Sequence, residues 1–339
     1  MRRLIKFLFL VGILPLVLLT SCKDDDPLVE ESEFEILSKY MAQNDLDLPD
    51  VLSGWVTAGG GLTVDPTDFS VADYYIIDLR ASSDFEAGHI KDAHNTTLTN
   101  VLNEAANANG KPILAVCYTG QTAARAVGAL RLMGFEAKSL KWGMSAWHSD
   151  FDKWTPNATD FSSPNWVTTG EPPAYGNYSE PTVVTNKATG EEILAARVQY
   201  ALTKSGWAVN KTDVLGTPSN YFVINKWPVE SWNEYGHING ANRIDEDLVL
   251  EGLKYVDPSK PALVYCYTGQ TSSITAMWME ALGYDARSLK FGVNGINHTG
   301  LLAGTAGSAP KKSWKGPGSG SILNLGYYDS SGTLHSPEN

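Results

Sequence analysis

Short apolar runs alternate with longer amphipathic stretches along most of this chain. Tyr75–Leu79, Ile113–Val116 and Ala137–Leu140 have strand length, and they predict buried strands of a parallel sheet. Between the last two runs, apolar residues recur at helical spacing from Ala123 to Met133, and Gly134 supplies a stop. This alternation is typical of the α/β class, in which helices flank a small parallel β-sheet.

The same pattern occurs twice. Residues 112–122 read PILAVCYTGQT and residues 261–271 read PALVYCYTGQT, an offset of 149 positions. The same offset carries the KSLKWG of residues 138–143 onto the RSLKFG of residues 287–292. Because the repeat is this long, each copy is expected to be a domain and not a unit of a solenoid.

Composition changes along the chain predict its domain boundaries. The stretch between the copies is rich in Pro, Ser, Thr, Asn and Gly, although Trp166 and Tyr175 indicate that it packs on another part of the protein. The end of the chain has low complexity, and partial disorder is expected there. The predicted parts are a signal peptide at 1–22, an acidic tether at 23–33, a first domain at 34–157, a linker at 158–186, a second domain at 187–303 and a tail at 304–339.

The first 22 residues have the pattern of a targeting signal. A basic start precedes the apolar run Phe7–Leu19, which is too short and too one-sided in charge for a transmembrane span. The ending Leu19-Thr20-Ser21-Cys22 resembles a bacterial lipobox, which implies a lipidated Cys22 and a lipid anchor in the membrane. A plain signal peptide is the alternative.

The residues after Cys22 refine the expected location. Lys23, in place of Asp, fits sorting to the outer membrane, so a cell envelope lipoprotein at the outer membrane is expected. The sequence does not assign it to the periplasmic or the surface face of that membrane. The run Lys23-Asp24-Asp25-Asp26 is either a surface-export signal or a solvated spacer.

Composition and charge exclude several classes of protein. With 339 residues, 43% of them hydrophobic, the chain can build two cores, and intrinsic disorder is excluded. A formal net charge of -12 argues against a nucleic-acid partner, since an acidic surface repels polyanions. Three cysteines are too few for a disulfide framework. With no phosphate-binding glycine motif or metal-ligand cluster in the sequence, no cofactor and no metal are predicted.

Cys117 and Cys266 each follow a predicted strand and precede a predicted helix. The unpaired N–H groups of the loop and first helical turn, together with the helix dipole, favour a thiolate there and lower the cysteine pKa. Gly120 and Gly269 permit the backbone angles of a tight cradle. Hydroxyl groups are available from Thr119, Thr122, Thr268 and Thr271. Such a loop holds an anion and presents a nucleophilic sulfur.

These motifs together resemble a rhodanese domain. The resemblance includes the Cys-Tyr-Thr-Gly-Gln-Thr loop, the upstream Asp78-Leu79-Arg80 and Gly88-His89-Ile90, and the downstream residues 140–147, and both copies share the pattern. It implies two rhodanese-like domains and a sulfurtransferase of the thiosulfate:cyanide type. In that family the loop cysteine takes a sulfane sulfur from a donor such as thiosulfate, becomes a persulfide, and passes the sulfur to cyanide or to an acceptor thiol.

The resemblance also assigns roles to individual residues. Cys117 and Cys266 are the implied nucleophiles. The implied anion cradle is formed by the loop residues Tyr118, Thr119, Gly120, Gln121 and Thr122 of the first copy and Tyr267, Thr268, Gly269, Gln270 and Thr271 of the second copy.

The loop separates this chain from phosphatases and arsenate reductases of the same fold, whose loops are one residue longer and close with an Arg. Here the sixth position is Thr, which favours sulfur transfer over phosphoryl transfer. Tyr stands directly after each cysteine, where many two-domain rhodaneses have a basic residue. Positive charge could come instead from Lys141, Lys290 or Arg125.

Other polar residues are expected to have structural roles. Asp78 and Arg80 brace the fold as a partly buried pair, and His89 and His237 are hydrogen-bonded structural residues. Cys117 and Cys266 belong to loops of different domains, so direct contact between the loops, and hence a disulfide, is not expected.

Two further hypotheses compete with an enzyme. The loops could capture a sulfur species or another small anion without turnover, which the missing basic residue favours. Alternatively, the domains could be degenerate scaffolds for another envelope protein, although both copies keep the cysteine. The physiological donor and acceptor, and whether one or both domains work, stay open.

Overall fold

The computed structural model describes residues 31–337. The predicted signal peptide, Cys22 and most of the acidic tether lie outside the described residues. The tether's last residue, Glu33, begins helix α1 (Glu33–Gln43), which Ser32 caps. From residue 31 to residue 337, no helix is long and apolar enough to cross a membrane.

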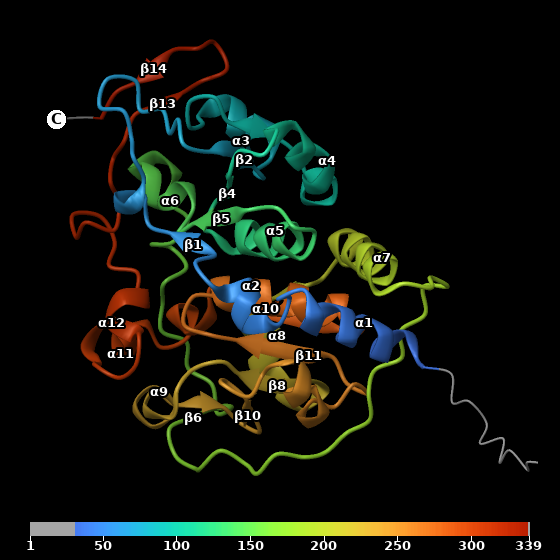
Figure 1. The fold of residues 1–339 in the computed structure, drawn as a ribbon. Helices are drawn as coiled ribbons and strands as arrows, with labels where there is room; N and C mark the ends of the chain where they lie inside the picture. The colour runs from blue at the N-terminus through green and yellow to red at the C-terminus, as the bar shows by residue number, and fades with distance from the viewer. Residues whose placement is uncertain (1–30, 338–339) are drawn as a thin grey trace, which may run out of the picture. The chain divides into compact units, whose positions relative to one another are not determined.

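Two five-stranded parallel sheets form the centre of the structure (Figure 1). The first has the order β1-β5-β4-β2-β3, and its strands are β1 (Val56–Thr57), β2 (Tyr75–Asp78), β3 (His94–Asn95), β4 (Ile113–Val116) and β5 (Ala137–Leu140). The second has the order β7-β12-β11-β8-β10, and its strands are β7 (Ala208–Val209), β8 (Phe222–Asn225), β10 (Asn242–Arg243), β11 (Ala262–Tyr265) and β12 (Ala286–Leu289). The strand order is the same in both, which confirms the predicted repeat of an α/β domain.

The central strands are buried on both faces, which explains their continuous apolar runs. In β4, Ile113 and Ala115 face the side of the sheet that carries the helices α5 (Gln121–Leu132) and α10 (Gln270–Ala281). Leu114 and Val116 face the opposite side, where they pack with Trp147. The remaining helices are α2 (Leu48–Leu52), α3 (Ser82–Ala87), α4 (Val101–Ala105), α6 (Met144–Trp147), α7 (Gly190–Thr203), α8 (Lys211–Gly216), α9 (Val229–Tyr235), α11 (His298–Ala303) and α12 (Ala309–Lys312).

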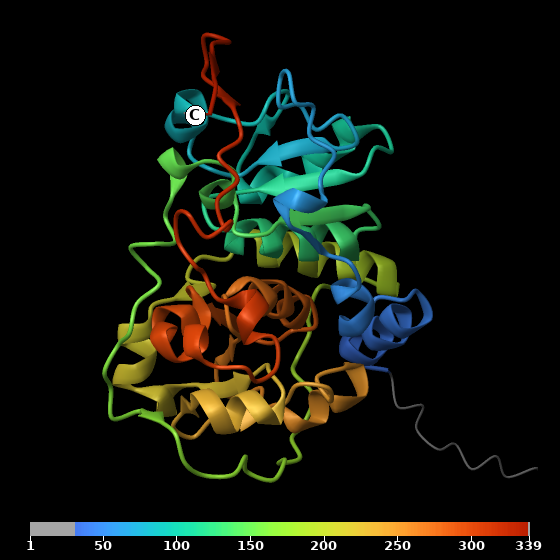
Figure 2. The ribbon, with the colours of Figure 1, turned by 90° about the vertical axis from the view of Figure 1, so that its left-hand side faces the viewer.

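Helices α5 and α10, the predicted helices that follow the two cysteines, pack directly against each other (Figures 1 and 2). Gly128 lies in this interface, where a Cβ would come within 3.1 Å of Ile274 and 3.2 Å of Met277. Helices α1 and α7 add to the same apolar cluster. The two repeats therefore share one core, and the helices that begin at the cysteine loops form its centre.

The linker and the tail pack on the domains. In the linker, β6 (Trp166–Val167) pairs with β9 (His237–Ile238), and Tyr175 contacts Tyr255. In the tail, β13 (Tyr327–Tyr328) pairs with β14 (Leu334–His335), and Trp147 donates to the carbonyl of Gly326. Composition predicts partial disorder in the tail. In the structure, however, aromatic side chains of the tail are buried against the first domain.

Candidate active site

The two cysteines lie at the carboxyl ends of the central strands β4 and β11. Gly120 and Gly269 precede the helices with φ angles of 82° and 75°, which turn the chain sharply. The helices begin at Gln121 and Gln270, so the last two residues of each predicted six-residue loop belong to the first helical turn. Each cysteine thus lies where free N–H groups of a helix start converge.

The sulfur of Cys117 accepts two backbone hydrogen bonds. The N–H groups of Gly120 and Ala123 donate to Sγ over 3.1 and 3.3 Å. The residue is 1% exposed, and burial raises the pKa of its thiol, although these backbone donors oppose that shift. The predicted lowering of this pKa is therefore wrong. Desolvation of the thiolate outweighs the amides because the loop is covered by its own helix and by the next turn.

Cys266 has different neighbours. Its Sγ lies 3.6 Å from the hydroxyl of Ser272 and 4.0 Å from that of Thr268. Ser272 in turn lies 2.7 Å from the hydroxyl of Ser288. Sequence reasoning missed Ser272, which the repeat offset places opposite Ala123. The two loops share a sequence, but their thiols have different hydrogen-bond partners.

A glycine turn after the next strand holds each cysteine loop. The N–H of Met144 donates to the carbonyl of Cys117 over 2.8 Å, and Val293 does the same for Cys266 over 3.0 Å. A Cβ on Gly143 would lie 2.3 Å from the Cys117 carbonyl oxygen, and one on Gly292 would lie 2.2 Å from that of Cys266. Only glycine fits at these two positions.

Two of the three predicted charge partners, Lys141 and Arg125, bind groups outside the cysteine loops. Lys141 lies in the turn after β5, as predicted, but its ammonium group donates to the carbonyl of Lys311 over 2.7 Å. Lys290 is half-buried at the equivalent position, and its backbone N–H donates to Val209. Arg125 is fully buried and pairs with Glu280 on α10, so the suggestion that it supplies positive charge to the cysteine loop is wrong. Its position on the face of α5 that meets α10 directs it away from the loop.

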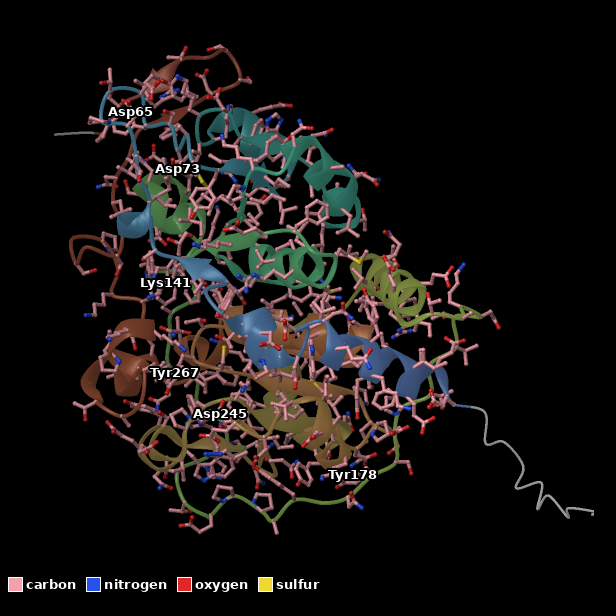
Figure 3. All side chains as sticks on the ribbon, in the orientation of Figure 1. Asp65, Asp73, Lys141, Tyr178, Asp245 and Tyr267 are labelled. Carbon is pink, nitrogen blue, oxygen red and sulfur yellow. The ribbon has the colours of Figure 1, made fainter. Side chains whose placement is uncertain are left out.

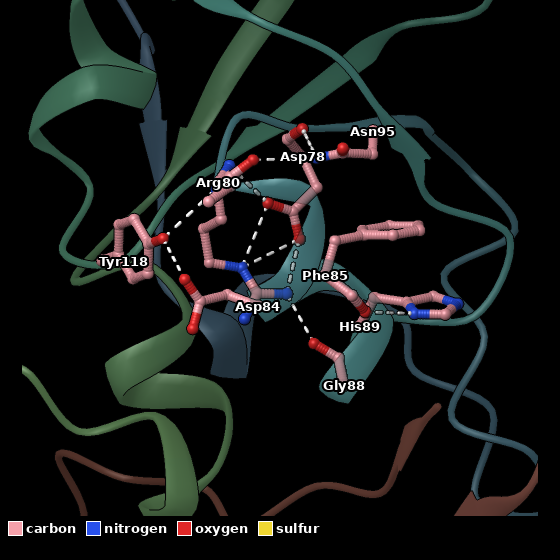
Figure 4. Close-up of polar contacts among 9 residues, drawn as sticks. Asp78, Arg80, Asp84, Phe85, Gly88, His89, Asn95 and Tyr118 are labelled. Atoms are coloured by element: carbon pink, nitrogen blue, oxygen red, sulfur yellow. Dashed lines mark hydrogen bonds and ion pairs between the residues drawn. The ribbon is translucent and has the colours of Figure 1, made fainter. Parts of the chain in front are cut away.

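Tyr118 stands directly after Cys117, the position at which the family resemblance leads one to expect a basic residue. Its hydroxyl donates to Asp84 Oδ2 over 2.5 Å and accepts from the backbone N–H of Ala81 over 3.2 Å (Figure 4). Tyr118 therefore ties the cysteine loop to the start of α3. In the second copy, the Tyr267 hydroxyl lies 2.6 Å from that of Ser231 (position in Figure 3).

The bracing pair is confirmed. Arg80 and Asp78 are buried and form a salt bridge of 2.7 Å, and Arg80 also donates to the carbonyl of Gly88 (Figure 4). His89 is hydrogen-bonded to the Phe85 carbonyl, as predicted. His237 was predicted to be a hydrogen-bonded structural residue, and the hydrogen-bonded part of that prediction is wrong for its Nδ1. This residue stacks on Trp232 at 3.5 Å, its Nδ1 lacks a hydrogen-bond partner among residues 31–337, and burial lowers its pKa to about 4.

The two cysteine loops contact each other, contrary to the sequence prediction. Gln121 accepts a hydrogen bond from the N–H of Phe291 over 2.7 Å and donates to the hydroxyl of Thr119. A Cβ on Gly120 would lie 2.9 Å from Gln270, and one on Gly269 would lie 2.5 Å from Gln121. Both thiols are free. The contact arises because α5 and α10 pack with their first turns adjacent, which the sequence of one copy does not reveal.

Comparison with known proteins agrees with this geometry. The family model of the rhodanese-like domain matches residues 67–150 and 222–299. Thiosulfate sulfurtransferase GlpE of Shewanella oneidensis is 36% identical over 75 residues, which are 22% of this chain and 74% of that protein. The chain belongs to the rhodanese family and contains two rhodanese-like domains.

Two solved structures cover more of the chain. SseA of Escherichia coli, described as a 3-mercaptopyruvate sulfotransferase, is 16% identical, with 71% of this chain and 98% of that chain covered and a TM-score of 0.26. The 3-mercaptopyruvate sulfurtransferase of Leishmania major is 17% identical, with 73% and 76% covered and a TM-score of 0.26.

Proposed function

We propose that this protein is a sulfurtransferase that carries sulfane sulfur as a persulfide on Cys117. The observation that supports this choice is the pair of backbone N–H groups directed at the Cys117 sulfur. Hydrogen-bond donors stabilise negative charge on Sγ before it attacks the donor and again when it leaves as a thiolate in the second step. The Cys266 thiol instead donates to the Ser272 hydroxyl over 3.6 Å, so its nearest partner is a side-chain hydroxyl and not a pair of backbone N–H groups.

The proposed reaction has two steps. The Cys117 thiolate attacks the outer sulfur of a donor such as thiosulfate, the sulfur–sulfur bond of the donor breaks, and sulfite leaves with the electron pair. An acceptor, cyanide or a thiolate, then attacks the terminal sulfur of the persulfide. The Cys117 thiolate leaves and is ready for another cycle. The Gly120 and Ala123 amides stabilise the negative charge on Sγ when the thiolate attacks the donor and when it leaves the persulfide.

Intact mass spectrometry tests this proposal. In chains carrying Cys22→Ser, incubation with thiosulfate is expected to add one sulfur atom, and Cys117→Ser is expected to abolish the addition. Cys266→Ser is the matched control, which should keep it. If no sulfur is added although the Cys117 thiol is free and the fold is intact, a module that binds anions without turnover is the better explanation. Addition that depends on Cys266 alone would move the persulfide to the second domain.

Burial of Cys117 predicts a particular pH dependence. Because its pKa lies above the ordinary value of a thiol, the thiolate fraction is small near neutral pH and grows with pH. In the Cys22→Ser, Cys266→Ser chain, the rate of alkylation by iodoacetamide should rise about tenfold per pH unit from about pH 7 to about pH 9. A plateau within that range would show that the loop amides outweigh burial and that the pKa is lowered.

We also propose that the protein is an envelope lipoprotein held at the outer membrane through Cys22. The support is the basic start, apolar run and lipobox-like ending of residues 1–22. The same mass spectra, recorded on the wild-type chain isolated from membranes, should show acyl chains on Cys22 and loss of the preceding residues. An unprocessed amino terminus would contradict the anchor.

A further inference from the structure

A pocket of about 450 Å³ lies beside the turn that holds the Cys117 loop. One wall comes from this turn and includes Lys141 and Trp142, and the other comes from the tail and includes Lys311, Lys315 and Ser321. Figure 3 shows Lys141 on the side of the first domain next to the tail. The volume is within the range of about 300–1,000 Å³ that is typical of small-molecule sites.

The pocket concentrates positive charge on an acidic protein. The formal net charge of the chain is -12, yet Lys141, Lys311 and Lys315 line one cavity, and Lys312 is next to Lys311 in the chain. Within residues 31–337, no carboxylate lies within 4.0 Å of the amino groups of these four lysines. Burial lowers the pKa of Lys141, and the charges of Lys312 and Lys311 add to this effect. Grouping like charges without a counterion is unfavourable, so a bound anion would stabilise the arrangement.

The tail wall of the pocket is firmly attached. Trp314 is 1% exposed and packs on Trp142 and Trp154, and its backbone N–H donates to Asn294. At the other side of the pocket, the N–H of Leu323 donates to the carbonyl of Ala146 over 2.8 Å. The cavity is therefore built before a ligand arrives, which reduces the entropy cost of binding. The tail wall also lies beyond residue 299, where the match to the rhodanese-like domain ends.

We propose that this pocket binds a small organic molecule that carries at least two acidic groups, either carboxylates or phosphates. Lys311 and Lys315 would pair with separate acidic groups, Lys141 would supply a third positive charge, and Ser319 and Ser321 offer hydroxyl donors. Trp142 and Leu323 would contact the apolar part of the ligand. The site does not depend on sulfur transfer, because binding is measured without a reaction at Cys117.

Isothermal titration calorimetry on the full chain tests the proposal with two probes. Pyrophosphate represents phosphates, and propane-1,2,3-tricarboxylate represents carboxylates, while acetate serves as a singly charged comparison. We expect at least one probe to bind one per chain, acetate to bind far more weakly, and Lys311→Gln and Lys315→Gln each to weaken binding by about tenfold. Whichever probe binds identifies the acid class. Bound probe should also protect Lys311 and Lys315 from acetylation, as read by peptide mass spectrometry.

Lys111→Gln is the matched control, because it removes the same charge at an exposed position that precedes β4, at the other end of that strand from Cys117. Its affinity for the probe should equal that of the wild type. The proposal is overturned if neither probe binds at about 1 mM, or if Lys111→Gln weakens binding as much as Lys311→Gln does. Since Lys311 and Lys315 are exposed, both variants are expected to fold.

Discussion

Gly143→Ala is expected to reduce sulfur loading on Cys117 by about 100-fold or more, because misplacing a reacting group by about 1 Å can cost that much. A Cβ at this position would lie 2.3 Å from the Cys117 carbonyl oxygen and 2.7 Å from the Tyr118 carbonyl carbon. Both contacts involve backbone, which cannot rotate away, and φ is 61° with ψ at -152°, a region that other residues avoid. The cysteine loop must therefore move, and the N–H groups of Gly120 and Ala123 no longer point at the Cys117 sulfur. The measurement is the rate of mass gain with thiosulfate.

Two glycine variants separate this effect from general strain. Gly134→Ala also places alanine at a positive φ, 83°, but its Cβ would have no atom within 4 Å, so loading should be unchanged. Gly292→Ala creates the equivalent clash in the second domain, at 2.2 Å from the Cys266 carbonyl oxygen, and should leave Cys117 loading within a few fold of the wild type. If Gly134→Ala lost as much loading as Gly143→Ala, the clash with the cysteine loop would not be the cause.

Arg125→Met is expected to lower the free energy of unfolding by about 3 kcal/mol, at the lower end of the range for breaking a buried ion pair. Arg125 and Glu280 are both fully buried, and they connect α5 to α10 across the interface between the repeats. Methionine fills similar volume, but it leaves the Glu280 carboxylate without its main partner. Lys204, whose Nζ lies 2.9 Å from Glu280, still compensates part of the charge and limits the loss. The measurement is urea unfolding near neutral pH.

The double variant Arg125→Met, Glu280→Leu is the control. Because it leaves no buried charge, it should recover most of the stability that Arg125→Met loses. If the double variant is as unstable as Arg125→Met, lost packing and not unpaired charge is the cause.

Features that depend on nearby residues were predictable from the sequence. The apolar runs identified β4 and β5 and, within one residue at its end, β2, because buried parallel strands need apolar side chains on both faces. Helical spacing identified α5 and α10, and the offset of 149 positions identified the repeat. The pairing of Asp78 with Arg80 also followed, since the two residues lie two positions apart at the end of one strand.

Features that depend on distant residues were decided only by the tertiary structure. Arg125 meets Glu280, 155 positions away in the sequence, because α5 and α10 pack together, and Gln121 reaches Phe291 for the same reason. The Cys117 pKa is raised because the whole fold excludes water from a loop whose own amides would lower that pKa. The lysine pocket forms because the tail returns to the first domain. Sequence spacing therefore determined the strands, helices and cysteine loops, whereas charge pairing and solvation at those loops depended on which distant segments cover them.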